Sequence, residues 1–481
     1  MKKKSITSNY VYNLMYQMII LLIPLFTTPY LTRVLGSNKL GIYSYTYSIV
    51  TIFFLLASLG INTYGQREIA YVQDDVKKRS KIFWELIVVR VFSTLISLIL
   101  LTLFSFITLK YSIYYQIFSI YVLANMFDIT WLYQGVEDFK GVSIRNTIVK
   151  VLFLISVFIF VKSKNDLWIY ILLFSLSTII TNLSFWIKIN KFVEITKFKK
   201  LQIKRHFKPV LIFFIPQIAS LIYTVLDKTM IGIMLPNISN VSFYEQASYI
   251  VKTILMLITT IATVMLSKMS YSYEKKDYNK LKEYLNGIIN FVWFGGCALL
   301  FGICAIIKNF VPWFYGNDYL SVINLVYVLS PLIILIGLNN VIGIQYLIPI
   351  KQQNKYIFAV LIGALVNLIL NLIFINIFGT IGAAISSCIS ECTILLIELY
   401  YVRDVITITE LIKPYIKYVV YGIIMFIPTY LCGNIFGATF LGTIFQILVG
   451  ICIYFLLLLI TRDSFVKTYI INNLCNNRRK K

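Results

Sequence analysis

The sequence has 481 residues, of which 59% are hydrophobic and 13% are charged, about half the charged share of an ordinary soluble domain. With so few polar residues to form a water-facing surface, the chain is excluded as a soluble enzyme, a secreted disulfide scaffold or a disordered segment. The formal net charge is +24, and its distribution along the chain decides whether nucleic acid or membrane lipid is the partner of these cations.

Apolar stretches that are long enough to cross a membrane as helices recur along the whole chain. We predict fourteen transmembrane helices, and twelve is the alternative count because the fifth stretch is short and the last two lie close together. The first stretch is too long for the apolar core of a signal peptide, so we expect it to remain as a spanning helix. The predicted stretches are 10–31, 41–63, 84–108, 112–132, 146–161, 167–188, 209–232, 241–266, 287–308, 321–348, 357–378, 382–402, 415–434 and 440–461.

The basic residues alternate between loops in a way that predicts the topology. If the N-terminus is cytoplasmic, 35 of the 44 lysines and arginines fall in inside segments and 6 in outside loops. This bias follows the positive-inside rule and predicts that both termini are cytoplasmic. The cations therefore face anionic headgroups, and we expect no nucleic-acid partner.

A basic loop over 188–208 divides the first twelve predicted helices into two sets of six that cross in the same direction. The start of the second helix in each set is weakly similar, at 43–50 and at 244–251. Parallel six-helix repeats predict two lobes around a central cavity. We therefore predict an all-α integral membrane fold with lobes over residues 1–200 and 201–404. Residues 405–481 would add two more helices and a basic cytoplasmic tail.

Charged side chains inside apolar spans are costly, so they are expected to face a cavity or one another. Arg90, Lys228 and Lys252 are candidates to bind an anionic substrate such as a pyrophosphate, which needs charge compensation in a low dielectric. Glu245 joins these substrate-binding candidates because it lies two helical turns from Lys252 on one face. Pairing of such cations with nearby acids, without contact to substrate, is the structural alternative.

Three acids inside the spans, Asp128, Asp227 and Glu391, are candidates for ion coupling, by relaying a proton or binding sodium. Structural hydrogen bonding is the more frequent role of such acids. Two other acids, Glu85 and Glu398, lie near predicted cytoplasmic ends and are expected to reach toward the interface.

No catalytic or metal-binding pattern occurs in the sequence. The seven cysteines form no C-x-x-C pair, and we expect inert thiols. The single histidine, His206, lies in the basic loop, where a solvated role is expected. The chain also lacks a phosphate-binding glycine loop, so we predict no enzyme activity, no cofactor and no metal.

Eight short runs near the predicted helix ends combine glycine, aromatic and charged residues. They are Thr28–Gly36, Leu40–Ser44, Leu59–Ile61, Tyr64–Ala70, Trp131–Glu137, Leu226–Gly232, Phe243–Ala247 and Phe314–Tyr319. Together these runs resemble the polysaccharide and O-antigen flippases (the Wzx type) of the multidrug/oligosaccharidyl-lipid/polysaccharide exporter superfamily. The resemblance covers roughly residues 5–400 and leaves the last two predicted helices outside.

The resemblance implies two six-helix lobes around a central, often cationic cavity. It implies that alternating access moves an undecaprenyl-pyrophosphate-linked oligosaccharide from the inner to the outer leaflet of the bacterial cytoplasmic membrane. The products would be capsule, exopolysaccharide or O-antigen, and transport would be coupled to an ion gradient. By position it makes Arg33 a candidate outward gate, so Arg33 joins the substrate-binding candidates. Expected partners are the lipid-linked oligosaccharide, membrane lipids and other polysaccharide-assembly proteins.

Two other functions remain open at this point. A multidrug or cation antiporter of the same superfamily would favour an acidic cavity, and the central acids of the spans are compatible with one. A polysaccharide polymerase would need a sizeable outside loop with acids and arginines. Because the predicted outside loops are short and nearly free of acids, the polymerase is the weaker alternative.

Overall fold

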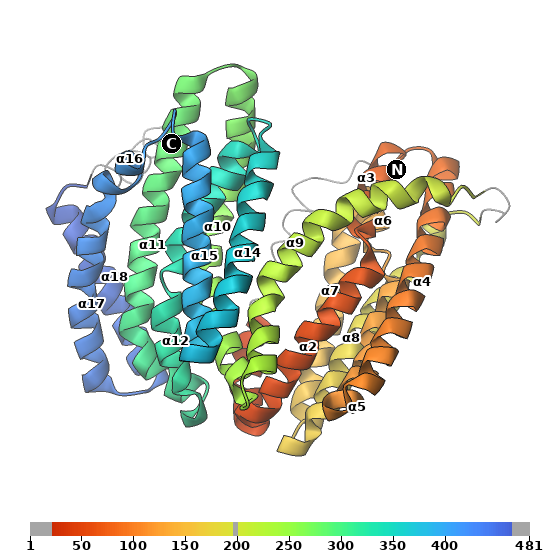
Figure 1. Ribbon diagram of the computed structural model, residues 1–481, viewed down its shortest axis with the longest axis horizontal. Helices are drawn as coiled ribbons and strands as arrows, with labels where there is room; N and C mark the ends of the chain where they lie inside the picture. Colours follow the sequence, from red (N-terminus) through yellow and green to blue (C-terminus); the bar gives the residue numbers. More distant parts are fainter. Residues whose placement is uncertain (1–21, 196–200, 464–481) are drawn as a thin grey trace, which may run out of the picture. The chain divides into compact units, whose positions relative to one another are not determined.

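The computed structural model describes residues 22–195 and 201–463 (Figure 1). Within these two ranges the chain forms helices and connecting loops without a β-strand, which confirms the predicted all-α fold. Contacts divide the chain into two compact units, Met1–Ser242 and Phe243–Lys481. The two units are described separately.

The first unit begins with a helix over 22–34 and continues through eight labelled α-helices. Most of them are apolar along their length, and short 3₁₀ turns join several neighbours. The eight helices are α2 (Gly36–Ser58), α3 (Ile61–Tyr71), α4 (Val76–Ile107), α5 (Ser112–Ala124), α6 (Thr130–Gly135), α7 (Phe139–Phe160), α8 (Leu167–Trp186) and α9 (Lys204–Met234).

Local sequence explains where several of these helices begin. Gly60 separates α2 from α3 with a left-handed φ of 74°, a conformation that glycine adopts without steric cost. Asp75 caps α4 by accepting a hydrogen bond from the Lys78 N–H at 3.0 Å. Asp138 caps α7 in the same way, through the Gly141 N–H at 3.4 Å. Aspartate is favoured at this position because its carboxylate satisfies a free N–H of the first turn.

Two of the flippase-like runs pack against each other in the core of this unit. The run Tyr64–Ala70 lies on α3, and the run Trp131–Glu137 covers most of α6. A Cβ added at Gly65 would lie 2.7 Å from the Trp131 ring, and one at Gly135 would lie 2.7 Å from Ile69. The glycines therefore let α3 and α6 approach closely, which explains the residue types of both runs.

The predicted fourth span, 112–132, is interrupted in the structure. It forms α5, a 3₁₀ turn over Asn125–Phe127 and the short α6. Arg90 of α4 donates hydrogen bonds to the carbonyl oxygens of Asn125 at 3.4 Å and of Asp128 at 2.9 Å. An irregular backbone inside a membrane protein is tolerated where buried groups satisfy it in this way.

The second unit contains the rest of the chain, and α10 begins four residues before its boundary. Its helices are α10 (Ser239–Glu274), α11 (Tyr278–Phe314), α12 (Ser321–Leu329), α13 (Leu332–Asn339), the π-helix η7 (Asn340–Leu347), α14 (Gln353–Phe378), α15 (Thr380–Val402), α16 (Ile408–Ile412), α17 (Ile416–Phe436) and α18 (Phe440–Ile460).

Two helical hairpins in this unit turn at glycines. Gly379 joins α14 to α15 with a φ of 61°, and Gly437 lies between α17 and α18 with a φ of 66°. These positive φ angles are strained for any residue with a Cβ. Between α13 and α14, η7 is an eight-residue segment with i→i+5 hydrogen bonds, a rare arrangement that is frequent at functional sites.

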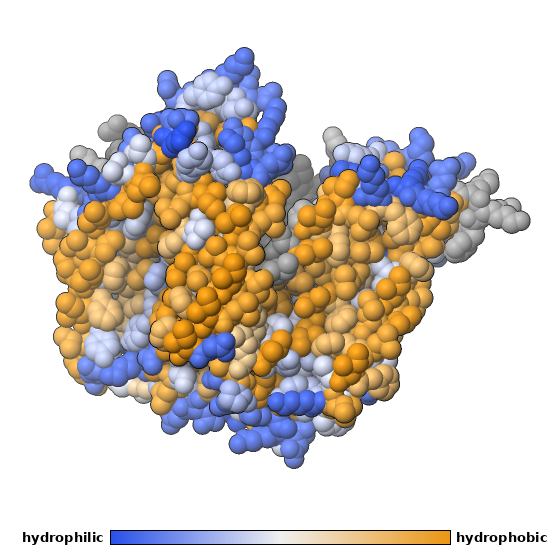
Figure 2. Space-filling model, viewed as in Figure 1, coloured by the Kyte–Doolittle hydropathy of each residue, from blue (hydrophilic) through white to orange (hydrophobic). Residues whose placement is uncertain are grey.

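Ten helical segments of the described residues are long and apolar enough to cross a membrane. They coincide with ten of the fourteen predicted stretches, and this confirms a multi-pass membrane protein. Of the other four, 10–31 lies partly outside the described residues, 112–132 is interrupted, and 209–232 and 241–266 fall in α9 and α10. Figure 2 shows hydrophobic side chains along the flanks of each unit and hydrophilic ones near the helix ends. The count of fourteen and the cytoplasmic termini stay predictions.

The compact units differ from the predicted division in two segments, because the helices after residue 404 belong to the second unit and not to a separate addition. Residues 201–242, assigned by sequence to the second lobe, belong by their contacts to the first unit. The Ser48 and Thr229 hydroxyls share a hydrogen bond of 2.9 Å, which ties α9 to α2. The division into repeat lobes at 200 and 404 stays a prediction about internal repetition.

Candidate functional site

Arg90 and Asp128 form a buried ion pair in the first unit. Arg90, on α4, is 0% exposed, and its Nη1 lies 3.0 Å from Asp128 Oδ2. Its Nη2 donates to Asn62 Oδ1. The other carboxylate oxygen, Oδ1, accepts from the Thr130 N–H at 3.0 Å and from the Thr130 hydroxyl at 2.6 Å. A predicted substrate-binding cation and a predicted ion-coupling acid therefore neutralise each other here, and their predicted roles remain untested.

Glu85 holds a second polar network, where α4 meets the start of α9. It is 0% exposed, although the sequence suggested an interfacial side chain. Its carboxylate accepts from the Gln202 N–H at 2.6 Å, from Arg205 Nε at 3.1 Å and from His206 Nε2 at 2.8 Å. Tyr64 of α3 completes the network, 2.9 Å from His206 Nδ1.

The expectation of a solvated His206 is wrong, since its side chain is 2% exposed. The hydrogen bonds fit a neutral ring whose Nε2–H donates to Glu85 and whose Nδ1 accepts from Tyr64, a tautomer inferred from these partners. Burial lowers the pKa of His206 below its ordinary value, and the neighbouring carboxylate of Glu85 opposes this shift. Burial has the larger effect because it penalises the charged ring.

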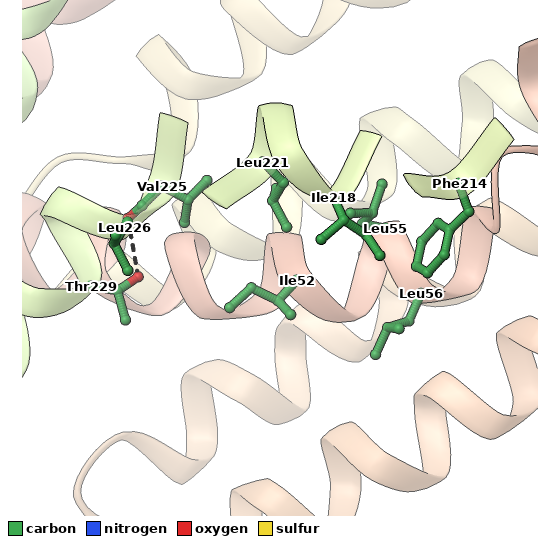
Figure 3. Close-up of a pocket in the computed structure, with 9 residues that line it drawn as sticks. All are labelled: Ile52, Leu55, Leu56, Phe214, Ile218, Leu221, Val225, Leu226 and Thr229. Carbon is green, nitrogen blue, oxygen red and sulfur yellow. Dashed lines mark hydrogen bonds between the residues drawn. The ribbon is translucent and has the colours of Figure 1, made fainter. Parts of the chain in front are cut away.

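An apolar groove of about 300 Å³ runs between α2 and α9 (Figure 3). Thr229 is the one polar side chain of its lining, and its hydroxyl donates to the Val225 carbonyl at 3.2 Å. The groove therefore presents hydrocarbon, and it offers almost nothing that could hydrogen-bond to a sugar. Its lining residues are Ile52, Leu55, Leu56, Phe214, Ile218, Leu221, Val225, Leu226 and Thr229.

The remaining predicted substrate-binding residues lie on separate elements. Arg33 is exposed, and its Nη1 donates to the Pro29 carbonyl at 2.8 Å. Lys228 is half-buried on α9, between two residues that line the groove. Glu245 is half-buried and Lys252 is exposed, both on α10. Three of the five predicted residues thus belong to the first unit and two to the second.

The predicted ion-coupling acids lie in different surroundings. Asp227 is half-buried on α9, next to Lys228. Glu391 is buried on α15, where Asn339 Nδ2 donates to its carbonyl at 3.1 Å and to its carboxylate. Glu398, two turns further along α15, is 0% exposed. The expectation that Glu398 reaches toward the interface is therefore wrong, because α14 and η7 cover it.

Sequence reasoning missed the polar residues that surround these acids. Asn339 and Gln345 are buried amides of the second unit, and Asn125 is a buried amide of the first. A signal was present, since an amide inside an apolar span is costly when it has no partner, although less costly than a charge. Within the described ranges, no group of three or more histidine, cysteine or acidic side chains is placed to hold a metal ion.

A family model described as "Polysaccharide biosynthesis protein" matches residues 6–272, more than half of the chain. The chain belongs to the polysaccharide biosynthesis protein family. The matched range includes the packed runs of α3 and α6 and the α2–α9 groove.

Two curated relatives of this family member carry the name "Putative O-antigen transporter". The one from Escherichia coli (strain K12) is 29% identical over 168 residues, which are 34% of this chain and 40% of that protein. The one from Shigella dysenteriae is 26% identical over 283 residues, which are 57% of this chain and 69% of that protein. The family, the named relatives and the helical fold support the predicted O-antigen flippase resemblance.

Solved structures share the fold at low sequence identity. The inward closed conformation of the lipid II flippase MurJ has a TM-score of 0.75 and is 20% identical, covering 94% of this chain and 99% of that one. An inward-facing multidrug transporter of the MATE family has a TM-score of 0.63 and is 15% identical, covering 79% and 94%. The family member is thus a multi-pass membrane protein with a transporter fold, consistent with the bacterial cytoplasmic membrane.

Proposed function

We propose that the protein is a flippase for lipid-linked oligosaccharides. Its cargo would be an undecaprenyl-pyrophosphate-linked repeat unit, moved by alternating access from the inner to the outer leaflet without covalent chemistry. The family match over residues 6–272 carries this proposal. The names of the two relatives and the fold shared with a lipid II flippase support it.

The chemistry of the first unit is compatible with such a cargo. The α2–α9 groove is apolar, which suits hydrocarbon rather than the hydroxyls of a sugar. The oligosaccharide and its pyrophosphate would need cationic and polar side chains instead. Arg33, Lys228 and Lys252 remain the candidates for that role, with Glu245 as a polar neighbour on α10. Arg90 reaches a substrate only if its ion pair with Asp128 opens.

A cell-based flip assay tests the proposal. The protein is expressed in a bacterium that lacks its own polysaccharide flippase, and lipid-linked repeat units are followed across the membrane. Units on the outer face only when the protein is present would support the flippase. If the folded protein leaves every repeat unit tested inside, and the same cells instead expel organic cations, the flippase proposal is wrong. The alternative function, a multidrug antiporter, is then favoured, and the fold is shared with such a transporter.

Charge removal on α9 and α10 tests the substrate-binding residues. We expect Lys228→Met and Lys252→Met to lower flipping while the melting temperature of the purified protein stays within a few degrees of the wild type. A pyrophosphate loses charge compensation in either variant. Lys280→Met is the matched control, because Lys280 is exposed and pairs with Asp277 at 3.5 Å. Full flipping by both α9 and α10 variants would remove these lysines from the site.

A further inference from the structure

A row of buried polar side chains follows α15 in the second unit. Glu391 and Glu398 are seven residues apart on this helix, so both point to one face, about 10 Å from each other along the axis. Both side chains are buried. Three other elements, α13, η7 and α14, cover that face with amide, aromatic and glycine residues.

Glu391 is held by one amide and by no described cation. Asn339, the last residue of α13, donates its Nδ2–H to the carbonyl and to the carboxylate of Glu391. The Oδ1 atom of the same amide is buried and has no hydrogen-bond partner among the residues that the structure describes. The amide therefore presents donors to the acid and leaves an acceptor free beside it.

Glu398 has even fewer partners. Both of its carboxyl oxygens are buried and make no hydrogen bond among the described residues. Oε1 lies directly against Gly343 of η7, and the Tyr356 ring of α14 contacts the same glycine, so a Cβ there would collide with both.

The charged and titratable neighbours do not neutralise these acids. Tyr356 of α14 and Cys392 of α15 lie close enough to interact electrostatically with Glu398 and Glu391, respectively. Both are neutral or acidic groups. The cations of the nearby helix ends stack on tyrosines instead: Lys355 lies 5.2 Å from the Tyr401 ring and Arg403 lies 4.7 Å from the Tyr400 ring.

A buried carboxyl group without a cation is stable only if it binds something. An ionised carboxylate in apolar surroundings costs several kcal/mol, which a bound proton, metal ion or water must offset. The donor of Asn339 at Glu391 opposes a metal cation at that oxygen.

We propose that Glu391 and Glu398 form a two-station proton-binding site on α15, lined by Asn339, Gly343 and Tyr356. The unpartnered Oδ1 of Asn339 would hold a water through which a proton moves between the stations. The π-helix supplies the close approach, because only glycine at position 343 lets η7 lie against the Glu398 carboxyl. The site itself needs no cargo, and only its coupling to transport rests on the proposed function.

Reaction with a hydrophobic carbodiimide tests proton binding in the wild-type protein. Such reagents modify protonated carboxyl groups in apolar surroundings, and peptide mass spectrometry locates the modified residue. In purified protein without lipid-linked cargo, we expect modification of Glu398 and Glu391 but not of Glu274, which is exposed and pairs with Lys351. Modification should fall with rising pH, by about tenfold per unit once the group is mostly ionised.

Two outcomes would overturn the proposal. The first is no modification of either acid in protein that melts like the untreated sample. The second is modification that disappears when sodium replaces choline at constant pH, which would identify a sodium site. Because no transport is measured, the result is independent of the flippase proposal. If flipping is also shown, Glu398→Gln should remove its dependence on a pH gradient, and Lys280→Met should retain it.

Discussion

Each of the two units buries an acid between helices, and the two acids differ in their ion-pair and hydrogen-bond partners. In the first unit, Asp128 has its charge matched by Arg90 and its second oxygen satisfied by Thr130. In the second unit, Glu398 has neither a cation nor a hydrogen bond among the described residues. A matched pair fixes a structure, whereas an unmatched acid is free to exchange a proton. Burial alone therefore does not identify a candidate for ion coupling, and the presence or absence of a cation partner must be considered as well.

Removing the cation of the matched pair should have the largest effect. Arg90→Met leaves Asp128 buried without its partner, which costs about 3–5 kcal/mol. We expect a strongly lowered melting temperature in detergent, measured by intrinsic fluorescence. Adding Asp128→Asn should recover much of the loss, because the uncompensated charge is gone. An Arg90→Met protein that melts like the wild type would show that the pair is not structural.

Replacement of Glu85 should have an intermediate effect on stability, because one of the three donors to its carboxylate is a half-exposed arginine. Glu85→Gln keeps one acceptor for the Gln202 N–H but turns an amide N–H toward Arg205 and His206. Hydrogen bonds to charged groups contribute about 1.5–3 kcal/mol, so we expect a loss of about 1–3 kcal/mol. The matched control is Glu274→Gln, an exposed acid whose ion pair contributes about 0–1 kcal/mol. Equal melting temperatures for both variants would contradict the prediction.

Acid should weaken the same network by a smaller amount. Because the folded-state pKa of His206 is lowered by burial, its contribution to stability is present above the unfolded value of about 6.5. That contribution is lost as the pH falls through the lower folded value. The groups that act on the ring are Glu85, Arg205 and Glu68, with Tyr64 hydrogen-bonded to it. Melting temperatures across this pH range should fall less in His206→Gln than in the wild type.

The unmatched acid should give the smallest change in stability. Glu398→Gln replaces a neutral acid by an amide of the same shape, so the free energy of unfolding should change by less than about 1 kcal/mol. The comparison with Arg90→Met is made under the same detergent and pH. A loss as large as that of Arg90→Met would mean that the Glu398 carboxylate is ionised and held by a partner.

Much of the fold followed from the sequence for a simple reason. The length and hydropathy of a spanning helix are local properties, because every backbone polar group is satisfied within the helix. Ten predicted stretches therefore coincide with candidate spans. The break in 112–132 did not follow, because it depends on Arg90, which is far away in sequence. The close approach of Trp131 to Gly65 could not be derived from either run alone.

The sequence by itself determined the membrane class, the helical fold, the family resemblance and a short set of charged residues in apolar spans. The tertiary structure decided which of those residues are neutralised. Arg90, a candidate ligand, is paired with Asp128, while Glu398, expected at the interface, and His206, expected in solvent, are both buried. The physical reason is that hydropathy is set by a residue and its neighbours along the chain. The free energy of a charge is set by the atoms packed around it, and these come from helices far apart in sequence.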